Sequence, residues 1–212
     1  MPDTPDAREP RAAARWAGAL RNRVRALLPG QGAPGTEATG STGSPAPARA
    51  AKTVLDYIDE RTILLDIDET DREAVIRRLA GLMQATGVVL DVDAVVQAAL
   101  ERETVSTTGI GEGIAIPHAA TTSCTAPVLA FARSRVGVPW HSLDEAPATL
   151  IFMIAVPETG AGTDHLRVLA QLSRSLLTPA FRAEIEAAAT PADVLNALAD
   201  SVRPTYGMGL DG

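Results

Sequence analysis

Hydrophobic residues follow two periodic patterns over most of the chain, and both patterns stop near its ends. Runs rich in Val, Ile, Leu and Phe predict strands at Thr62 to Ile67, Val128 to Ser134 and Thr149 to Val156. The last run is apolar at nearly every position, which is typical of a central strand buried on both faces. A shorter run, Ile114 to Ile116, predicts one more strand, and Pro117 should end it because proline has no N–H for the ladder.

Helical spacing of apolar residues predicts helices between these strands. One helix should begin at Thr70, whose hydroxyl can form a capping box with Glu73, and end at Gly87. A second should begin at Asp91 or Asp93 and end near Arg102. Further helices are predicted from Thr163 or Asp164, from Pro179 and from Pro191 to Val202, with a short helical turn at Thr53 to Ile58. Strands that alternate with helices predict an α/β domain of three layers.

The pattern does not decide the structure of one segment. Residues Val136 to Trp140 either continue the strand that begins at Val128 or fold back around Gly137 as a hairpin. His141 follows in a loop, where we expect it to be exposed.

The chain before residue 53 has a different composition from the domain, which we expect to span residues 53–203. Residues 1–52 predict a largely disordered extension and linker, and residues 204–212 predict a flexible tail. Within the extension, residues 11–28 alternate arginines with apolar residues at helical spacing, which indicates a basic amphipathic helix. Two interpretations remain open: a segment that binds a membrane surface or a partner, and a marginal helix in a dispensable extension.

Charge divides the chain in the same place. Residues 1–52 carry eight Lys/Arg and four Asp/Glu, a net charge of +4, so of the total of −7 the remainder carries −11. An acidic domain argues against nucleic acid as its main partner, because phosphate contacts need a basic surface. No apolar run approaches the roughly 20 residues of a membrane span. Arginines interrupt the one candidate signal sequence, so we expect a soluble, cytoplasmic chain. Cys124 is the single cysteine, so we expect no internal disulfide.

Three glycines, Gly109, Gly111 and Gly113, lie just before His118. Glycines turn tightly and leave their amide N–H groups accessible to an anion. A neutral imidazole at a strand end beside such amides is suited to attack phosphorus. The other interpretation is a turn histidine held by local hydrogen bonds. Glu112 would repel a phosphate, so we expect its side chain to point into solvent.

A longer motif favours the first interpretation. Arg102-Glu103, followed by Ser106 to His118 with its three glycines and its Ile-Pro-His ending, closely resembles the phosphohistidine signature of the fructose/mannitol-type IIA domain of the bacterial phosphotransferase system. The nitrogen-regulatory IIA proteins belong to the same family. The resemblance extends from about Val54 to about Val202. It implies a mixed, mainly parallel sheet of about five strands with helices on both faces.

The resemblance also implies roles for three residues. His118 would be the phosphorylated residue, and His165 would be the family's second histidine, which lies beside the first. Arg102 would offer paired donors to the phosphoryl group. The alternative for Arg102 is a helix C-terminal arginine that answers the helix dipole or pairs with Glu103.

Three hypotheses for function follow. The first is a phosphotransferase component that accepts a phosphoryl group on His118 from an HPr-like carrier and passes it to a IIB component in trans. The second is a regulatory module of the nitrogen type, whose phosphorylation state controls its binding to target proteins. The third, a metal site of His118, His165 and Cys124, is disfavoured because these residues lack ligand spacing. We therefore expect neither a metal nor a cofactor.

Overall fold

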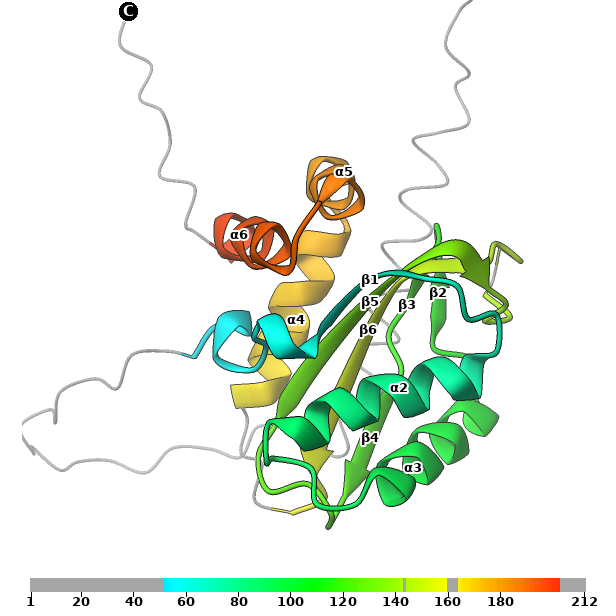
Figure 1. Ribbon diagram of the computed structural model, residues 1–212, viewed down its shortest axis with the longest axis vertical. Coiled ribbons are helices and arrows are strands. Elements are labelled where there is room, and N and C mark those ends of the chain that lie inside the picture. Colours follow the sequence, from blue (N-terminus) through cyan, green and yellow to red (C-terminus); the bar gives the residue numbers. More distant parts are fainter. Residues whose placement is uncertain (1–51, 143, 160–163, 203–212) are drawn as a thin grey trace, which may run out of the picture.

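The computed structural model describes residues 52–142, 144–159 and 164–202, which form one sheet between two layers of helices (Figure 1). The strands are β1 (Ile63–Ile67), β2 (Gly109–Gly111), β3 (Ile114–Ala115), β4 (His118–Thr121), β5 (Val128–Val138) and β6 (Ala148–Pro157). The helices are α2 (Arg72–Ala85), α3 (Val92–Val105), α4 (Asp164–Leu176), α5 (Pro179–Ala187) and α6 (Pro191–Val202), with short 3-10 helices η1 (Val54–Asp56) and η2 (Glu60–Thr62). The predicted amphipathic helix at 11–28 and the tail at 204–212 lie outside the described residues.

The sheet is organised around β6. Its strand order is β1-β5-β6-β3-β2, and β4 also pairs with β6, beyond the end of β3. Strands β3 and β4 run parallel to β6, and β1 runs parallel to β5, whereas β5–β6 and β2–β3 are antiparallel. The prediction of a mixed, mainly parallel sheet in an α/β domain is therefore confirmed. The described part holds six strands, because the glycine segment itself forms β2.

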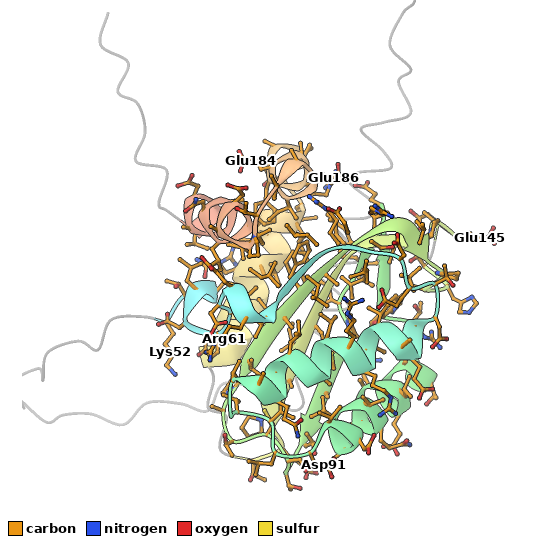
Figure 2. All side chains as sticks on the ribbon, in the orientation of Figure 1. Lys52, Arg61, Asp91, Glu145, Glu184 and Glu186 are labelled. Atoms are coloured by element: carbon orange, nitrogen blue, oxygen red, sulfur yellow. The ribbon has the colours of Figure 1, made fainter. Side chains whose placement is uncertain are left out.

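Each face of the sheet has its own apolar core. Phe131 and Phe152, with ring centroids 4.6 Å apart, lie on the face covered by α4, α5 and α6. Ile151 and Met153 point to the opposite face, which α2 and α3 cover. Several charged side chains lie on the outside, among them Lys52, Arg61 and the two α5 carboxylates at 184 and 186 (Figure 2). Successive side chains of β5 and β6 point to opposite faces of the sheet, so each of the two strands contributes apolar residues to both cores.

The predicted helix starts at Pro179 and Pro191 are confirmed by α5 and α6, and the caps of α2 and α3 test two more. Asp91 caps α3, because its carboxylate accepts the amides of Asp93 and Ala94 at 2.9 and 3.2 Å. The predicted cap at Thr70 is wrong. Asp71 caps α2 instead and accepts the amide of Ala74 at 2.8 Å. A carboxylate one residue later in the chain replaces the predicted hydroxyl, and α2 begins correspondingly later.

We expect Asp91→Ala to lower the free energy of unfolding by about 1 kcal/mol, because two amides of the first turn of α3 lose their acceptor. Urea unfolding followed by far-UV circular dichroism measures this loss. Gln97→Ala on the exposed side of the same helix is the matched control and should cause no loss. Equal unfolding midpoints for the two variants would contradict the capping role.

Two further sequence expectations concern strands. The strand from Val128 is continuous to Val138, so the hairpin alternative is wrong, and Gly137 accommodates its positive φ of 78° within β5. β3 ends at Ala115, two residues before Pro117, and pairing with β6 resumes in β4 at His118, so the proline interrupts the pairing but does not end it. The carbonyl of Pro117 accepts the amide of Ile154 at 3.0 Å, which proline allows since it lacks only the donor.

Within the described ranges, none of the helices combines the length and the apolar character that crossing a membrane requires.

Candidate active site around His118

His118 is the first residue of β4 and lies half-buried beside the central strand. It pairs with Ile154 of β6, and paired residues of neighbouring strands point to the same face of a sheet. Ile154 belongs to the core beneath α4, α5 and α6, so the imidazole faces that layer. His118 is therefore at the beginning of a strand, directly after the break at Pro117, rather than at a strand end.

The backbone defines how the imidazole is protonated. Nδ1 of His118 lies 3.2 Å from the carbonyl oxygen of Ile116. A carbonyl can only accept a hydrogen bond, so Nδ1 carries the proton in this contact. In the neutral ring the lone pair is then on Nε2.

The surroundings of His118 favour the neutral ring. Burial is the largest effect and lowers the pKa of His118 below its ordinary value of about 6.5. The hydrogen bond to Ile116 raises this pKa, the positive charge of Arg102 lowers it, and the negative charge of Glu103 raises it. Because the net direction is downward, the imidazole is mostly neutral at pH 7.

We expect the NMR titration midpoint of His118 to lie below about 6.5, so the neutral form is lost only as the solution becomes more acidic than that. Arg102→Gln should raise the midpoint, because the variant removes a positive charge that disfavours imidazolium. Arg61→Gln, which changes an exposed arginine of η2, is the control and should leave it unchanged. A midpoint that falls in Arg102→Gln would contradict this electrostatic assignment.

Arg102 lies in the last turn of α3, as predicted. Its Nη1 donates to the carbonyl oxygen of Ser106 at 3.1 Å, so it satisfies a group just after the helix end. The predicted alternative of a pair with Glu103 is wrong, since the salt-bridge partner of Glu103 is Arg72. Arg102 is nevertheless close enough to His118 to affect its charge state.

His165 lies in the first turn of α4. This helix belongs to the layer that His118 faces, and it begins a few residues after β6 ends. The side chain of His165 is outside the described part of the molecule, so the predicted contact between the two histidines stays a prediction.

The three glycines form a β-hairpin rather than an open loop. Gly109 pairs with Ala115 and Gly111 with Ile114, and Glu112 and Gly113 occupy the turn with φ of 52° and 73°. The turn lies well away from the imidazole, because the five residues from Gly113 to His118 correspond to about 16 Å of extended strand.

The amide of Gly109 is already bonded, since it donates to the Thr107 hydroxyl at 3.0 Å. Phosphate binding by Gly109, Gly111 and Gly113 stays a prediction. The hairpin geometry weighs against it for the two glycines nearest the turn.

The prediction for Glu112 is wrong in part. Its carboxylate does not point freely into solvent but accepts from Arg182 of α5 at 2.8 Å, while its amide donates to Asp144 at 2.7 Å. Both partners are distant in sequence, so local charge reasoning could not find them. His141, in contrast, is exposed as expected.

A buried polar network next to the site was missed by sequence reasoning. Glu103 accepts from the amide of Thr108 at 2.9 Å, from the Thr108 hydroxyl at 2.5 Å and from Arg72 at 3.3 Å. The Thr108 hydroxyl also accepts from the indole N–H of Trp140 at 2.9 Å. One signal was available: a glutamate in the last turn of a helix opposes the helix dipole and needs a specific partner.

The described residues contain no cluster of three or more His, Cys, Asp or Glu arranged to hold a metal, and the side chain of His165, one member of the third hypothesis, is not among them. Cys124 is buried, and its thiol contacts the carbonyl oxygen of Ala126 at 2.9 Å. Burial raises the pKa of the Cys124 thiol, which makes it a poor nucleophile.

Comparison with known proteins identifies the family. Residues 56–201 match the model of "Phosphoenolpyruvate-dependent sugar phosphotransferase system, EIIA 2". The fructose-specific EIIA component of Haloferax volcanii is 42% identical over 154 residues, which cover 70% of this chain and 99% of that protein. The fructose-specific EIIABC component of Bacillus subtilis is also 42% identical, over 132 residues that cover 62% of this chain but 21% of that longer protein.

Solved structures agree with this match. The nitrogen regulatory protein IIA-Ntr of Neisseria meningitidis superimposes with a TM-score of 0.63 at 26% identity, and the match covers 68% of this chain and 97% of that one. The matched region includes the sheet, both helical layers and His118. The chain belongs to the phosphoenolpyruvate-dependent sugar phosphotransferase system EIIA 2 family.

Proposed function

We propose that this protein is a phosphohistidine carrier, and that His118 accepts and passes on the phosphoryl group. The observation that carries the proposal is the contact of Nδ1 with the Ile116 carbonyl, because it leaves Nε2 as the nucleophilic nitrogen of a mostly neutral ring. The fructose-specific relatives support a place in a sugar phosphotransferase system.

The transfer step balances without an added acid or base. The lone pair of Nε2 attacks the phosphorus of a phosphohistidine on an HPr-like carrier, and the new N–P bond forms as the carrier's N–P bond breaks. The carrier's ring, which carries a proton on its other nitrogen, keeps the electron pair of its broken bond and leaves as neutral imidazole. The proton on Nδ1 of His118 stays in place, and the Ile116 carbonyl stabilises the positive charge that the ring gains.

Two side chains are proposed to assist. The guanidinium of Arg102 can exchange its contact with the Ser106 carbonyl for the phosphoryl oxygens, which are stronger acceptors because they are charged. His165 lies in the first turn of α4, in the layer that His118 faces, and its proposed role is to donate a hydrogen bond to the same phosphoryl group. Phosphoryl transfer depends on such positioning and charge stabilisation more than on covalent assistance.

The proposed acceptor is a IIB component supplied in trans, and the proposed location is therefore the cytoplasm. The resemblance to IIA-Ntr favours a second candidate function, a regulatory module whose binding to target proteins depends on phosphorylation. Phosphorylation adds roughly −1.5 to −2 charges, enough to alter a protein interface.

Intact-mass measurement tests the proposal and separates these roles. The protein is incubated with phosphoenolpyruvate, enzyme I and an HPr-type carrier, and we expect it to gain one acid-labile phosphate. A fructose-type IIB domain is then added. Loss of the phosphate from this protein with gain by IIB supports the transport role, and retention supports the regulatory role. No gain from a carrier that phosphorylates a known IIA protein would overturn the proposed function.

A further inference from the structure

Glu103 occupies an unusual position for a carboxylate. It lies in the last turn of α3, and its side chain is 2% exposed. Burial of a charge is costly, and the negative end of the helix dipole adds to the cost. Three donors offset it: the guanidinium of Arg72 and both polar groups of Thr108. Because the buried carboxylate of Glu103 needs all three hydrogen bonds, it holds the groups that donate them in fixed positions.

The group that Glu103 orders is the loop between α3 and the hairpin. Its two carboxylate oxygens bind the amide and the hydroxyl of Thr108 at the same time, so neither the backbone nor the side chain of Thr108 can rotate freely. Trp140, which is fully buried, donates its indole N–H to the same hydroxyl at 2.9 Å. The Thr107 hydroxyl donates to the Trp140 carbonyl at 2.6 Å, which is a second hydrogen bond between this loop and Trp140.

Hydrogen bonds continue from this loop to the imidazole. The carbonyl of Thr108 accepts the amide of Ile116 at 3.1 Å. The carbonyl of Ile116 in turn accepts Nδ1–H of His118 at 3.2 Å. The amide of Ile116 is thus bonded to Thr108, and the carbonyl of Ile116 is bonded to the imidazole of His118. The orientation of the Ile116 carbonyl depends on Thr108, and Thr108 depends on Glu103.

We propose that Glu103 is a positioning residue for His118: through Thr108 and Ile116 it orients the carbonyl that fixes the Nδ1–H tautomer and presents Nε2 to a phosphoryl donor. This inference deepens the proposed function and rests on it for its biological meaning. The hydrogen-bond chain itself can be tested without any phosphotransfer partner.

The first test reads the tautomer directly. Long-range ¹H–¹⁵N NMR spectra of ¹⁵N-labelled protein, recorded at pH values above the titration midpoint of His118, distinguish a ring protonated at Nδ1 from one protonated at Nε2. We expect the wild type to be protonated at Nδ1 and Glu103→Ala to be a mixture of the two tautomers. Glu103→Gln should keep most of the Nδ1–H form, because its amide oxygen can still accept the Thr108 amide. Glu101→Gln, the same change at an exposed site on the same helix, is the matched control.

The second test reads the reactivity of the ring with phosphoramidate, a small donor that needs no carrier protein. Attack of Nε2 forms the N–P bond and releases ammonia. We expect Glu103→Ala to react about tenfold more slowly than the wild type, since misplacement of a reacting group commonly costs that much or more. Glu103→Gln should recover most of the rate, and Glu101→Gln should match the wild type.

Stability must be separated from positioning. If Glu103→Ala does not fold, Glu103→Leu replaces it, because leucine fills the buried site and still removes both acceptor oxygens that bind Thr108. A folded Glu103→Ala, or in its place Glu103→Leu, that retains the pure Nδ1–H form and the wild-type rate overturns the inference. A wild type with the Nδ1–H form that no carrier protein phosphorylates would overturn the proposed function and leave the positioning role standing.

Discussion

His118→Ala is expected to lose acid-labile phosphorylation completely, which we place at more than about a 1000-fold fall in rate. The variant removes the nitrogen that forms the N–P bond, and no described side chain beside it can replace an imidazole. The fold should survive, because His118 is half-buried and its hydrogen bond ends on a carbonyl. The measurement is the time course of phosphate gain by intact mass with an HPr-type donor.

His141→Asn is the matched control for this prediction. His141 is exposed and has a φ of 52°, a conformation that asparagine tolerates better than most residues. We expect this variant to be phosphorylated at the wild-type rate. If His118→Ala gained phosphate as fast as His141→Asn, another residue would be the acceptor.

Arg133→Met is expected to lower the free energy of unfolding by about 2 to 4 kcal/mol, the largest stability effect that we anticipate. The guanidinium Nη1 donates to three carbonyls at the end of α5, those of residues 185, 186 and 188, at 3.3, 2.7 and 2.6 Å. Its Nε and Nη2 donate to Asp66 at 3.2 and 2.9 Å. Methionine retains the apolar stem but leaves these acceptors without a donor in a site where the arginine side chain is 13% exposed.

Arg135, two residues along the same strand, provides the control. It pairs with Asp68, but both side chains are about 60% exposed, at 61% and 60%. Exposed pairs contribute little, so Arg135→Met should change the free energy of unfolding by less than about 0.5 kcal/mol. Urea unfolding of both variants measures the difference. Arg133→Lys should fall between them, because lysine retains the charge but cannot reach all the acceptors. Similar midpoints for Arg133→Met and Arg135→Met would refute the bridging role.

The parts of the fold that the sequence predicts correctly are those set by local chemistry. The run from residue 149 to 156 forms β6 because apolar residues at every position suit a strand covered on both faces. Asp91 caps α3 because its carboxylate reaches amides two and three residues away. These interactions involve neighbours in the chain, so pattern and spacing are sufficient to find them.

Errors arise where a distant partner decides the outcome. Pro117 reads as a strand end, yet β6 lies beside it and allows pairing to resume. Glu112 is exposed as expected, yet its carboxylate pairs with Arg182, a partner that the local sequence does not indicate. Glu103 reads as a partner for its neighbour Arg102, whereas Arg72 and Thr108 bind it. For the site, the motif identifies His118, but the tautomer depends on the Ile116 carbonyl, which only the folded backbone places.

The way β3 and β4 lie along β6 also restricts how the length of this segment can change. Ile114 pairs with Leu150 and His118 with Ile154. The segment from β3 to β4 and the strand β6 therefore advance by the same number of residues across the break at Pro117. Successive residues of a strand point to opposite faces. An insertion or deletion of one residue between the hairpin and His118 would therefore turn the imidazole toward the α2 and α3 layer. A change of two residues would restore its direction but shift it by about 7 Å along the sheet. The interval from Ile114 to His118 should thus be fixed in length, even where its side chains can be exchanged.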